Sequence, residues 1–449
     1  MRLLTLVFCF LLLMIISCNS SGPAGESEAP ESSGSVAFVG VNVIPMSTPG
    51  MTAGRTVLVK GDRILEVGPA GSVRVPPDAR IIDGSGKYLL PGLAEMHGHI
   101  PPPQSPAEFT EDVLFLYVAN GITTVRGMLG HEGQLELKAR ANRGEMISPT
   151  LYLAGPSFNG DSVNSPQEAT AKVRQQKQEG WDLLKVHPGL SLAEYDAMAR
   201  AAKVEGIRFG GHVPEDVGLT HAIEMGQETM DHVDGYVEHL DGYEKVVDKE
   251  RLAEIVRKSK DAGVWIVPTM ALWETLFGTA DLATLQSYPE LKYMPRQQVS
   301  QWINAHRNRL ADPQFKAEIS RRAIDNRMSI LRALHEGGVR ILMGTDAPQQ
   351  FSVPGFSLHR ELERMSAAGM SPWEILRSGT VNVGDYFRKS DQFGAVAKGH
   401  RADLLLVDAN PLDDIANVAK ISGVMIRGRW LSREEIDQRL TKIAAKNAS

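Results

Sequence analysis

The sequence is poor in cysteine, in excess positive charge and in long apolar runs. Cysteine occurs only as Cys9 and Cys18 in 449 residues, so no disulfide framework can hold the body of the protein. The net charge is −6, and without a basic face we expect no nucleic-acid partner. Hydrophobic residues make up 43% and charged residues 23%, which excludes a disordered or polytopic membrane protein. This length predicts one large domain and a smaller one.

The N-terminus carries an apolar run over Leu3–Ile16, which is shorter than the roughly 20 residues that span a bilayer. It predicts a signal peptide over 1–17, and its end resembles the lipobox of bacterial lipoproteins, which implies a lipid anchor on Cys18. Residues 18–35 are rich in Ser, Gly, Pro and Glu and predict a flexible tether. We therefore expect a bacterial envelope protein anchored through this lipid and facing the periplasm. Asn19 after the cysteine favours the outer membrane.

Short β-rich runs occur near both ends of the remaining chain, at 36–44, 56–59, 63–67, 402–407 and 424–427. The Gly61-Asp62 pair between the second and third runs is typical of a two-residue hairpin. The runs near the N-terminus and those near the C-terminus are both short and rich in β-forming residues. We predict that residues 36–88 and 390–434 together form one small β-sandwich domain.

Eight apolar runs alternate with helical patterns between these ends, at 90–97, 121–127, 150–155, 181–187, 207–212, 228–233, 264–269 and 340–346. The helical patterns include 166–179 and 191–205. Such alternation predicts an α/β fold with a parallel sheet, and eight strands indicate a (β/α)8 TIM barrel over 89–389. A doubly wound sheet would contain fewer strands. The long connection over 271–338 predicts a lid or a helical insertion, with several aromatic residues in 271–295.

Six potential metal ligands lie at the ends of these runs: His97, His99, Lys185, His212, His232 and Asp346. A TIM barrel places its chemistry at the C-terminal ends of its strands. His97 and His99 are two residues apart, so on an extended chain both imidazoles face the same side. A lysine inside a barrel is costly unless it is paired or chemically changed. An ammonium has no lone pair for a metal, whereas a carbamate formed on the neutral amine of Lys185 can bridge two cations.

The motifs around these residues resemble the amidohydrolase superfamily, nearest to the branch of imidazolonepropionase-related and prolidase-like enzymes. They are LLPGLAEMHGH (89–99), GITTVR (121–126), LLKVH around Lys185, GGHVP around His212, MDHVDG around His232, MGTDA (343–347) and GHRADLLLVDANPL (399–412). Two departures concern neighbours of the ligands. Gly127 stands where relatives usually carry Asp, and Asp231 stands where Glu is common, so both affect contacts around the site.

The resemblance implies a binuclear centre with two divalent ions. One ion would be held by His97, His99, Lys185 and Asp346, and the other by carbamylated Lys185, His212 and His232. A hydroxide shared by the two ions would attack the substrate, with Asp346 acting as general base and then as acid. Zinc fits the nitrogen and oxygen ligands best, and Mn, Fe or Co would fit the same residues.

The expected reaction is hydrolysis of an amide C–N bond in a small carboxylate-bearing substrate. Relatives suggest a dipeptide such as Xaa-Pro, or an N-acyl amino acid. Candidate substrate contacts at or just after the strand ends are Arg126, His131, His187, Tyr236 and His239.

Two other functions stay open at this point. His212 and Glu215 form an HxxE motif, which mononuclear deaminases and imidazolonepropionases of the same superfamily use to place a proton-transferring Glu. In that reading Glu215 is the proton shuttle and Lys185 does not bind metal. A non-catalytic lipoprotein that uses the barrel as a binding module is a third possibility, although all six ligand positions are filled. The sequence predicts no oligomeric state.

Overall fold

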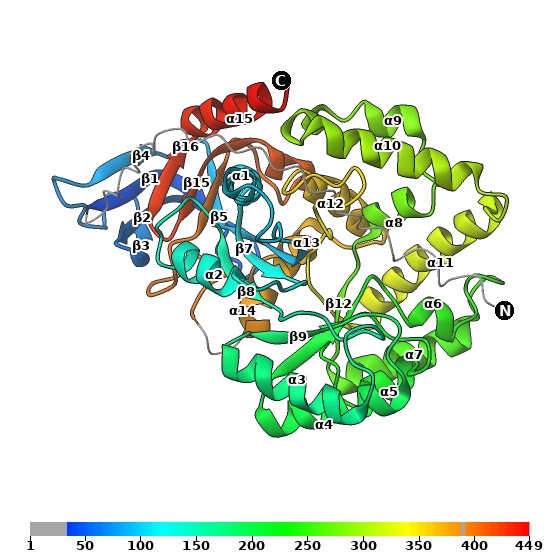
Figure 1. Ribbon diagram of the computed structural model, residues 1–449. Helices are drawn as coiled ribbons and strands as arrows, with labels where there is room; N and C mark the ends of the chain where they lie inside the picture. The colour runs from blue at the N-terminus through cyan, green and yellow to red at the C-terminus, as the bar shows by residue number, and fades with distance from the viewer. Residues whose placement is uncertain (1–33, 388–390, 449) are drawn as a thin grey trace. The chain divides into compact units, whose positions relative to one another are not determined.

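A computed structural model describes residues 34–387 and 391–448 of the chain (Figure 1). The predicted signal peptide, the lipid anchor at Cys18 and almost all of the predicted tether lie outside these residues. Within the described ranges, no helix has both the length and the apolar character needed to cross a membrane.

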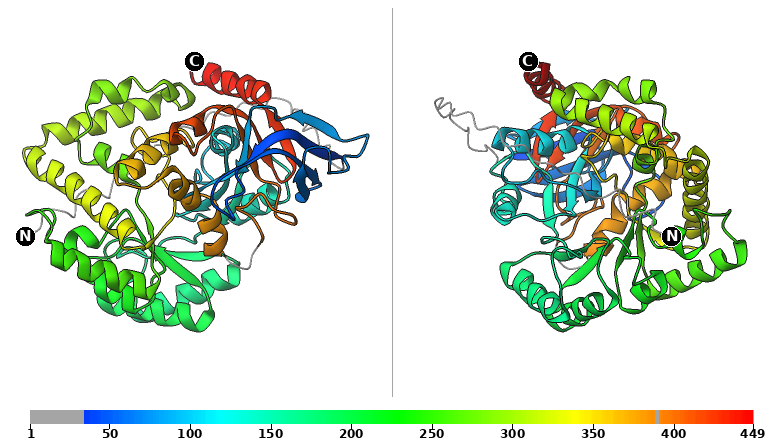
Figure 2. Two further views of the ribbon diagram at one scale, coloured as in Figure 1. Left: turned by 180° about the vertical axis from the view of Figure 1, so that it is seen from behind. Right: turned by 45° about the vertical axis from the view of Figure 1, so that its right-hand side comes forward.

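The two ends of the described chain form one eight-stranded sheet. Its strands are β1 (Ser35–Val43), β2 (Thr52–Lys60), β3 (Arg63–Pro69), β4 (Arg80–Asp83), β5 (Tyr88–Pro91), β14 (Leu404–Val407), β15 (Ile421–Ile426) and β16 (Arg429–Ser432). The strand order is β16-β15-β14-β5-β1-β2-β3, and β4 also pairs with β1. The blue N-terminal and red C-terminal strands therefore lie side by side (Figure 2). The predicted hairpin is confirmed, because Lys60 pairs with Arg63 across the turn.

This small domain is hydrogen-bonded as a single sheet that curls around its own core. β1 pairs with β4 through its first half and with β5 through its second half, with irregular register between Phe38 and Val43. Phe38 of β1 and Trp430 of β16 make an edge-to-face contact with ring centroids 5.2 Å apart. Strands far apart in the sheet order thus share one core, which is how the expected sandwich is realised.

The large domain is the predicted α/β TIM barrel. Its strands are β6 (Leu93–Gly98), β7 (Ile122–Gly127), β8 (Thr150–Leu153), β9 (Leu183–Val186), β10 (Arg208–Gly211), β11 (Thr229–Asp231), β12 (Trp265–Val267) and β13 (Arg340–Ile341). These strands form two hydrogen-bonded groups, β6 to β8 and β9 to β13. Neighbouring strands are parallel in both groups. A parallel bridge between Ala154 and Leu183 joins β8 to β9. Met96 N donates to Met343 O over 2.8 Å, which joins β6 to the segment after β13 and completes the ring.

The first apolar run, 90–97, contains two strands rather than one barrel strand. β5 pairs with β14 in the small domain, and β6 begins after Gly92 as the first barrel strand. A Cβ atom at Gly92 would lie 2.3 Å from Thr123 Oγ1, so only glycine fits at the crossing. Because both strands are buried and apolar, the sequence pattern does not show where the chain passes from one sheet to the other.

Helices follow the barrel strands, and several were predicted. They are α1 (Ala107–Ala119), α2 (Gln134–Asn142), α3 (Pro166–Glu179), α4 (Leu192–Glu205), α5 (Leu219–Glu224), α6 (Tyr236–His239), α7 (Lys249–Ala262), α12 (Ser357–Ala367), α13 (Pro372–Ser378) and α14 (Val381–Phe387). The 3-10 helix η2 (Ile415–Ala419) and helix α15 (Arg433–Ala448) belong to the C-terminal part. The predicted helices α3 and α4 begin at Ser165 and Ser191, whose side chains accept the N–H of the third helical residue.

The long connection after β12 is helical. It contains α8 (Met270–Leu276), α9 (Leu282–Gln286), the 3-10 helix η1 (Pro289–Tyr293), α10 (Arg296–Ala311) and α11 (Ala317–Glu336). α8 begins directly beyond the end of β12, and α11 leads into β13. α8 thus starts near the carboxyl end of β12, and α11 ends near the amino end of β13.

Candidate metal centre

The six predicted ligands lie at the same end of the barrel, where the strands terminate. His97 and Lys185 are within β6 and β9, whereas His212 and His232 directly follow β10 and β11. His99 and Asp346 follow β6 and β13. Five of the six are buried, and His99 is partly exposed. The barrel topology therefore gathers residues that are up to 249 positions apart in the sequence.

His97, His99 and Asp346 form one compact group. Each offers a ligand atom, and these atoms lie within 4.8 Å of one another. His99 Nε2 is 2.5 Å from Asp346 Oδ1. Asp346 has a left-handed backbone with φ 64°, and its N–H donates to the carbonyl of His97 over 2.7 Å. Such strain in a non-glycine residue is typical of functional sites, and this group could bind a metal ion.

His212 and His232 extend this group. The His232 ring lies 4.3 Å from that of His97 and 4.5 Å from that of His212, between centroids. His232 Nε2 is buried without a hydrogen-bond partner and lies 3.8 Å from Asp346 Oδ2. An unpaired buried nitrogen that faces a carboxylate fits a position where a cation belongs.

The Nδ1 atoms of three histidines each lie within 2.7 Å of a side-chain oxygen, which turns their Nε2 atoms toward the cluster. His97 Nδ1 contacts Asp231 Oδ2 at 2.7 Å, and His212 Nδ1 lies 2.5 Å from Asp234 Oδ2. His232 Nδ1 is 2.7 Å from Thr269 Oγ1. Partners of this kind fix the tautomer of metal-binding histidines.

Burial also keeps two of these histidines neutral. It lowers the pKa of His97 and His232 well below the ordinary value, and neighbouring positive groups add to the effect. A histidine must be deprotonated to bind a metal. Both imidazoles are therefore ready to act as ligands at neutral pH.

Lys185 lies at the centre of the cluster. Its side chain is fully buried, and its Nζ is 3.2 Å from His97 Nε2. Among the described residues, no carboxylate forms an ion pair with it. Burial lowers the pKa of Lys185 to about 8, so about a tenth of the amine is neutral at pH 7. A permanent ammonium at this buried position would be costly, and it would offer no lone pair to a metal.

Two buried groups beneath the cluster were not predicted as site residues. Glu95 accepts hydrogen bonds from the main-chain N–H groups of His97 and Thr345, and burial raises its pKa to about 8. Asp231 joins Arg126 to His97. Glu95 could have been found, because it precedes His97 by two residues and thus shares its side of the strand.

Two of the predicted substrate contacts lie beside the cluster. The His187 ring stacks on His212 with centroids 5.0 Å apart, and its buried Nδ1 has no hydrogen-bond partner. Burial and the nearby Lys185 hold the pKa of His187 well below the ordinary value. Burial and the positive charge of nearby His99 lower the pKa of His131, whose side chain is partly buried.

The structure shows where the other three predicted substrate contacts lie. Arg126 is fully buried, and its guanidinium donates to Asp231, Thr229, Tyr386 and the carbonyl of Met96. The buried Tyr236 hydroxyl shares a hydrogen bond of 2.7 Å with Ser259 on α7. His239 ends α6, where its carbonyl accepts a hydrogen bond from Arg251. The side chains of Arg126 and Tyr236 are thus held by partners inside the protein.

Glu215, the alternative proton shuttle, is exposed. Within the described parts of the chain it makes no hydrogen bond or ion pair, whereas His212 of the same motif is held by Asp234. The HxxE spacing therefore does not join this carboxylate to the cluster.

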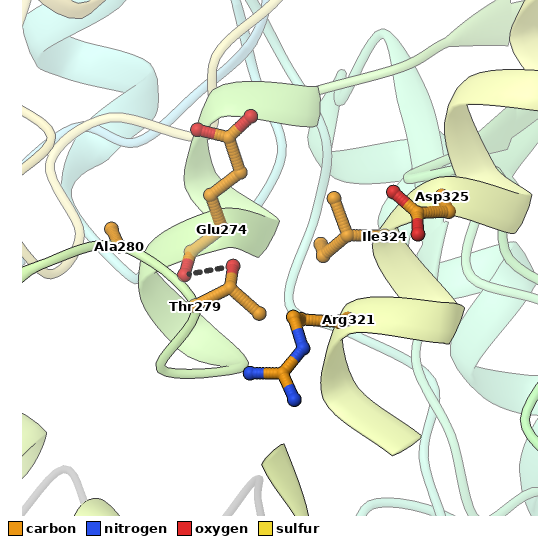
Figure 3. Close-up of a pocket in the computed structure, with 6 residues that line it drawn as sticks. All are labelled: Glu274, Thr279, Ala280, Arg321, Ile324 and Asp325. Atoms are coloured by element: carbon orange, nitrogen blue, oxygen red, sulfur yellow. Dashed lines mark hydrogen bonds between the residues drawn. The ribbon is translucent and has the colours of Figure 1, made fainter. Parts of the chain in front are cut away.

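A cavity of about 210 Å³ lies between α8 and α11 and is lined by Glu274, Thr279, Ala280, Arg321, Ile324 and Asp325. Arg321 and Ile324 extend from α11 toward the loop that carries Thr279 and Ala280 (Figure 3). None of the predicted site residues lines it. The predicted metal ligands thus lie outside this cavity.

Comparison with known proteins gives one family. The sequence pattern of the Amidohydrolase family matches residues 88–431. The adenine deaminase of Rubrobacter xylanophilus is 24% identical over 402 residues, which cover 85% of this chain and 56% of that protein. The chain therefore spans about half the length of that relative.

Solved structures share the fold. A bottromycin amidohydrolase superimposes with a TM-score of 0.74 at 23% identity, covering 94% of this chain and 92% of that one. A Xaa-Pro dipeptidase with methionine bound in its active site gives a TM-score of 0.66 at 20% identity, covering 89% and 100%.

Proposed function

The chain belongs to the amidohydrolase family, whose members act on carbon–nitrogen bonds, and we propose that it uses two divalent metal ions to hydrolyse an amide C–N bond. The proposed substrate is a small molecule with a free carboxylate, such as an Xaa-Pro dipeptide or an N-acyl amino acid. Family membership also makes the non-catalytic reading unnecessary, since every ligand position of the family motif is filled.

The position of Lys185 carries this proposal. Its buried Nζ lies 3.2 Å from His97 Nε2, within the cluster that also contains His212 and His232. A mononuclear site would not need a lysine here, and a buried ammonium without a counter-ion is costly. A carbamate on this amine would supply a ligand to each of two ions. The carbamate and the second ion are part of the proposal.

Bound divalent ions would lower the pKa of a water molecule and polarise the substrate carbonyl, and zinc is the proposed ion. The residues of the chain supply the remaining functions. Asp346, whose Oδ1 contacts His99 Nε2, is placed to accept the proton of the attacking water and to give it to the leaving nitrogen. His187 and His131 border the cluster and are the remaining candidates for binding the substrate.

A library of Xaa-Pro dipeptides and N-acyl amino acids, read out by the free amine, tests the substrate class. We expect release of the amine at rates that depend on added zinc and bicarbonate. An Asp346→Asn variant that still binds metal should be inactive, because the amide cannot carry the proton. A library without any hydrolysed amide, assayed with metal-loaded protein, would refute the proposed substrate class.

A deaminase is the second candidate, because adenine deaminases are among the curated relatives. This function would release ammonia from an aminated heterocycle and would use Glu215 for proton transfer. The exposure of Glu215 disfavours it. Ammonia release from adenine that is abolished in a Glu215→Gln variant would establish the deaminase instead.

We also propose that the protein is anchored in the bacterial envelope through a lipid on Cys18, facing the periplasm. The apolar run before this cysteine supports the proposal. Metabolic labelling with a fatty acid tests it: wild type should be labelled and found with the outer membrane, and Cys18→Ala should not be labelled.

A further inference from the structure

A buried guanidinium lies behind the two histidines of the proposed second metal position. Arg327 belongs to α11, and its side chain is fully buried. Its Nη1 donates a hydrogen bond to the main-chain carbonyl of His232, and its Nη2 lies 3.6 Å from Asp234 Oδ1. The other oxygen of Asp234 holds His212 Nδ1 at 2.5 Å. One side chain of the insertion thus connects to both histidines.

The guanidinium is itself held in one orientation. Its Cζ lies 4.1 Å from the centre of the Trp273 ring on α8, and its Nη2 donates to Tyr243 Oη over 3.1 Å. Trp273 also makes an edge-to-face contact with His232, with centroids 5.9 Å apart. A planar guanidinium can stack and donate in several directions at once, which a lysine cannot do.

The carbonyl that Arg327 binds belongs to a strained turn. His232 has φ 66° and Val233 has φ 59°, and a β-branched residue rarely adopts this region. Such a conformation persists only where the surroundings hold it. The hydrogen bond from Arg327 to the His232 carbonyl is one such restraint.

We propose that Arg327 is a positioning residue for the second metal position. It touches neither the reacting atoms nor the ion, and it sets the direction of the His212 and His232 rings through Asp234 and the His232 carbonyl. The inference rests on the proposed function only for the presence of metal at these histidines. It gives α11 of the insertion an indirect part in metal binding, through the groups that hold the two histidines.

Metal titration of Arg327→Gln tests the proposal, with Arg322→Gln as the matched control. Arg322 lies on the same helix and donates two hydrogen bonds to the Tyr243 carbonyl, without reaching either histidine. Metal-free proteins are titrated with Zn²⁺ against a chelator, and with Co²⁺ while the visible absorption of the bound ion is followed. We expect Arg327→Gln to weaken one of two ions by about 10- to 100-fold and to alter its Co²⁺ spectrum. Arg327→Lys should restore part of the affinity, and Arg322→Gln should resemble wild type.

Several results would overturn the proposal. Wild-type affinity for every ion in Arg327→Gln is one, and an equal loss in Arg322→Gln is another, because it would assign the effect to docking of α11. If Arg327→Gln does not fold, Asp234→Ala removes the link to His212 alone, and unchanged metal affinity in that variant would refute the role. The titration needs no substrate. A wild type that binds metal but hydrolyses no amide would therefore refute the proposed function and leave this inference intact.

Discussion

Two Arg–Asp–His groups support the metal cluster, and they are built differently. The inner triad consists of Arg126, Asp231 and His97, all on barrel strands. Its Arg and Asp are both fully buried, with Nη2 3.0 Å from Oδ2. The outer triad consists of Arg327, Asp234 and His212, and its Arg and Asp are 3.6 Å apart with the Asp side chain 14% exposed.

The difference follows from where each arginine originates. Arg126 is part of the barrel wall, so the inner triad cannot be altered without altering the barrel. Arg327 comes from helix α11, so the outer triad depends on how that helix packs against the barrel. We therefore expect damage to the inner triad to reduce folding stability, and damage to the outer triad to reduce metal affinity.

The largest effect is expected for Arg126→Met. The substitution leaves Asp231 as a buried charge with no cationic partner, and such losses cost about 3–5 kcal/mol. Urea unfolding should show this decrease in the free energy of unfolding. The double variant Arg126→Met/Asp231→Asn should recover much of it. A loss below about 1 kcal/mol would show that the two triads do not differ in the way described.

Lys185→Ala should separate the two halves of the cluster, because this residue is the proposed common ligand. We expect the protein to hold at most one tightly bound ion and kcat/KM to fall by about a thousandfold or more, which corresponds to several kcal/mol of transition-state stabilisation. Lys172→Ala is the control. Burial lowers the pKa of Lys172 to about 8 as well, but its Nζ donates to the Ser157 carbonyl, away from the cluster. Equal effects of the two substitutions would contradict the assignment.

The pH dependence of carbamate formation should reflect the buried position of Lys185. Burial lowers its pKa to about 8 from the ordinary 10.5, and carbon dioxide reacts only with the neutral amine. In metal-free protein at fixed dissolved carbon dioxide, the initial rate of carbamate formation should therefore increase as the pH rises through 8 and then level off, because the amine is by then neutral. Carbon-13 NMR with labelled bicarbonate follows the growth of the carbamate signal, which Lys185→Ala should lack. A midpoint near 10.5 would indicate a solvated amine.

The smallest effect is expected for Trp273→Phe in the outer triad. The phenyl ring can still stack on Arg327, but it attracts a cation less strongly than the indole ring does. Cation–π contacts are worth about 0.5–2 kcal/mol. Zinc affinity should fall by less than about tenfold, and Trp273→Ala should reduce it further. An unchanged affinity in Trp273→Ala would show that Arg327 needs no stacking partner.

The strands and the ligands of the cluster could be predicted because each is encoded locally. Every barrel strand coincides with an apolar run, and each proposed ligand stands at the end of one, so topology alone brings them together. The residues that hold the ligands in place could not be predicted. Arg327 is 95 residues from the carbonyl it binds, and the helix that carries it follows an irregular insertion. No local pattern places it behind His232.

The direction of a buried side chain could not be predicted for a related reason. Arg126 ends a predicted strand, as a substrate contact would, and nothing in its neighbourhood shows whether the side chain points toward the barrel mouth or into the core. Its partner Asp231 was noticed only as a departure from the usual Glu. The boundary between β5 and β6 was missed because apolar residues fill both strands.

The central claim is that a modified Lys185 joins two metal ions, and native mass spectrometry of protein grown with zinc and bicarbonate tests it most directly. The account predicts two zinc ions and one added carbon dioxide per chain, with the carbon dioxide and at least one ion lost in Lys185→Ala. A single ion per chain that is retained in Lys185→Ala would contradict it.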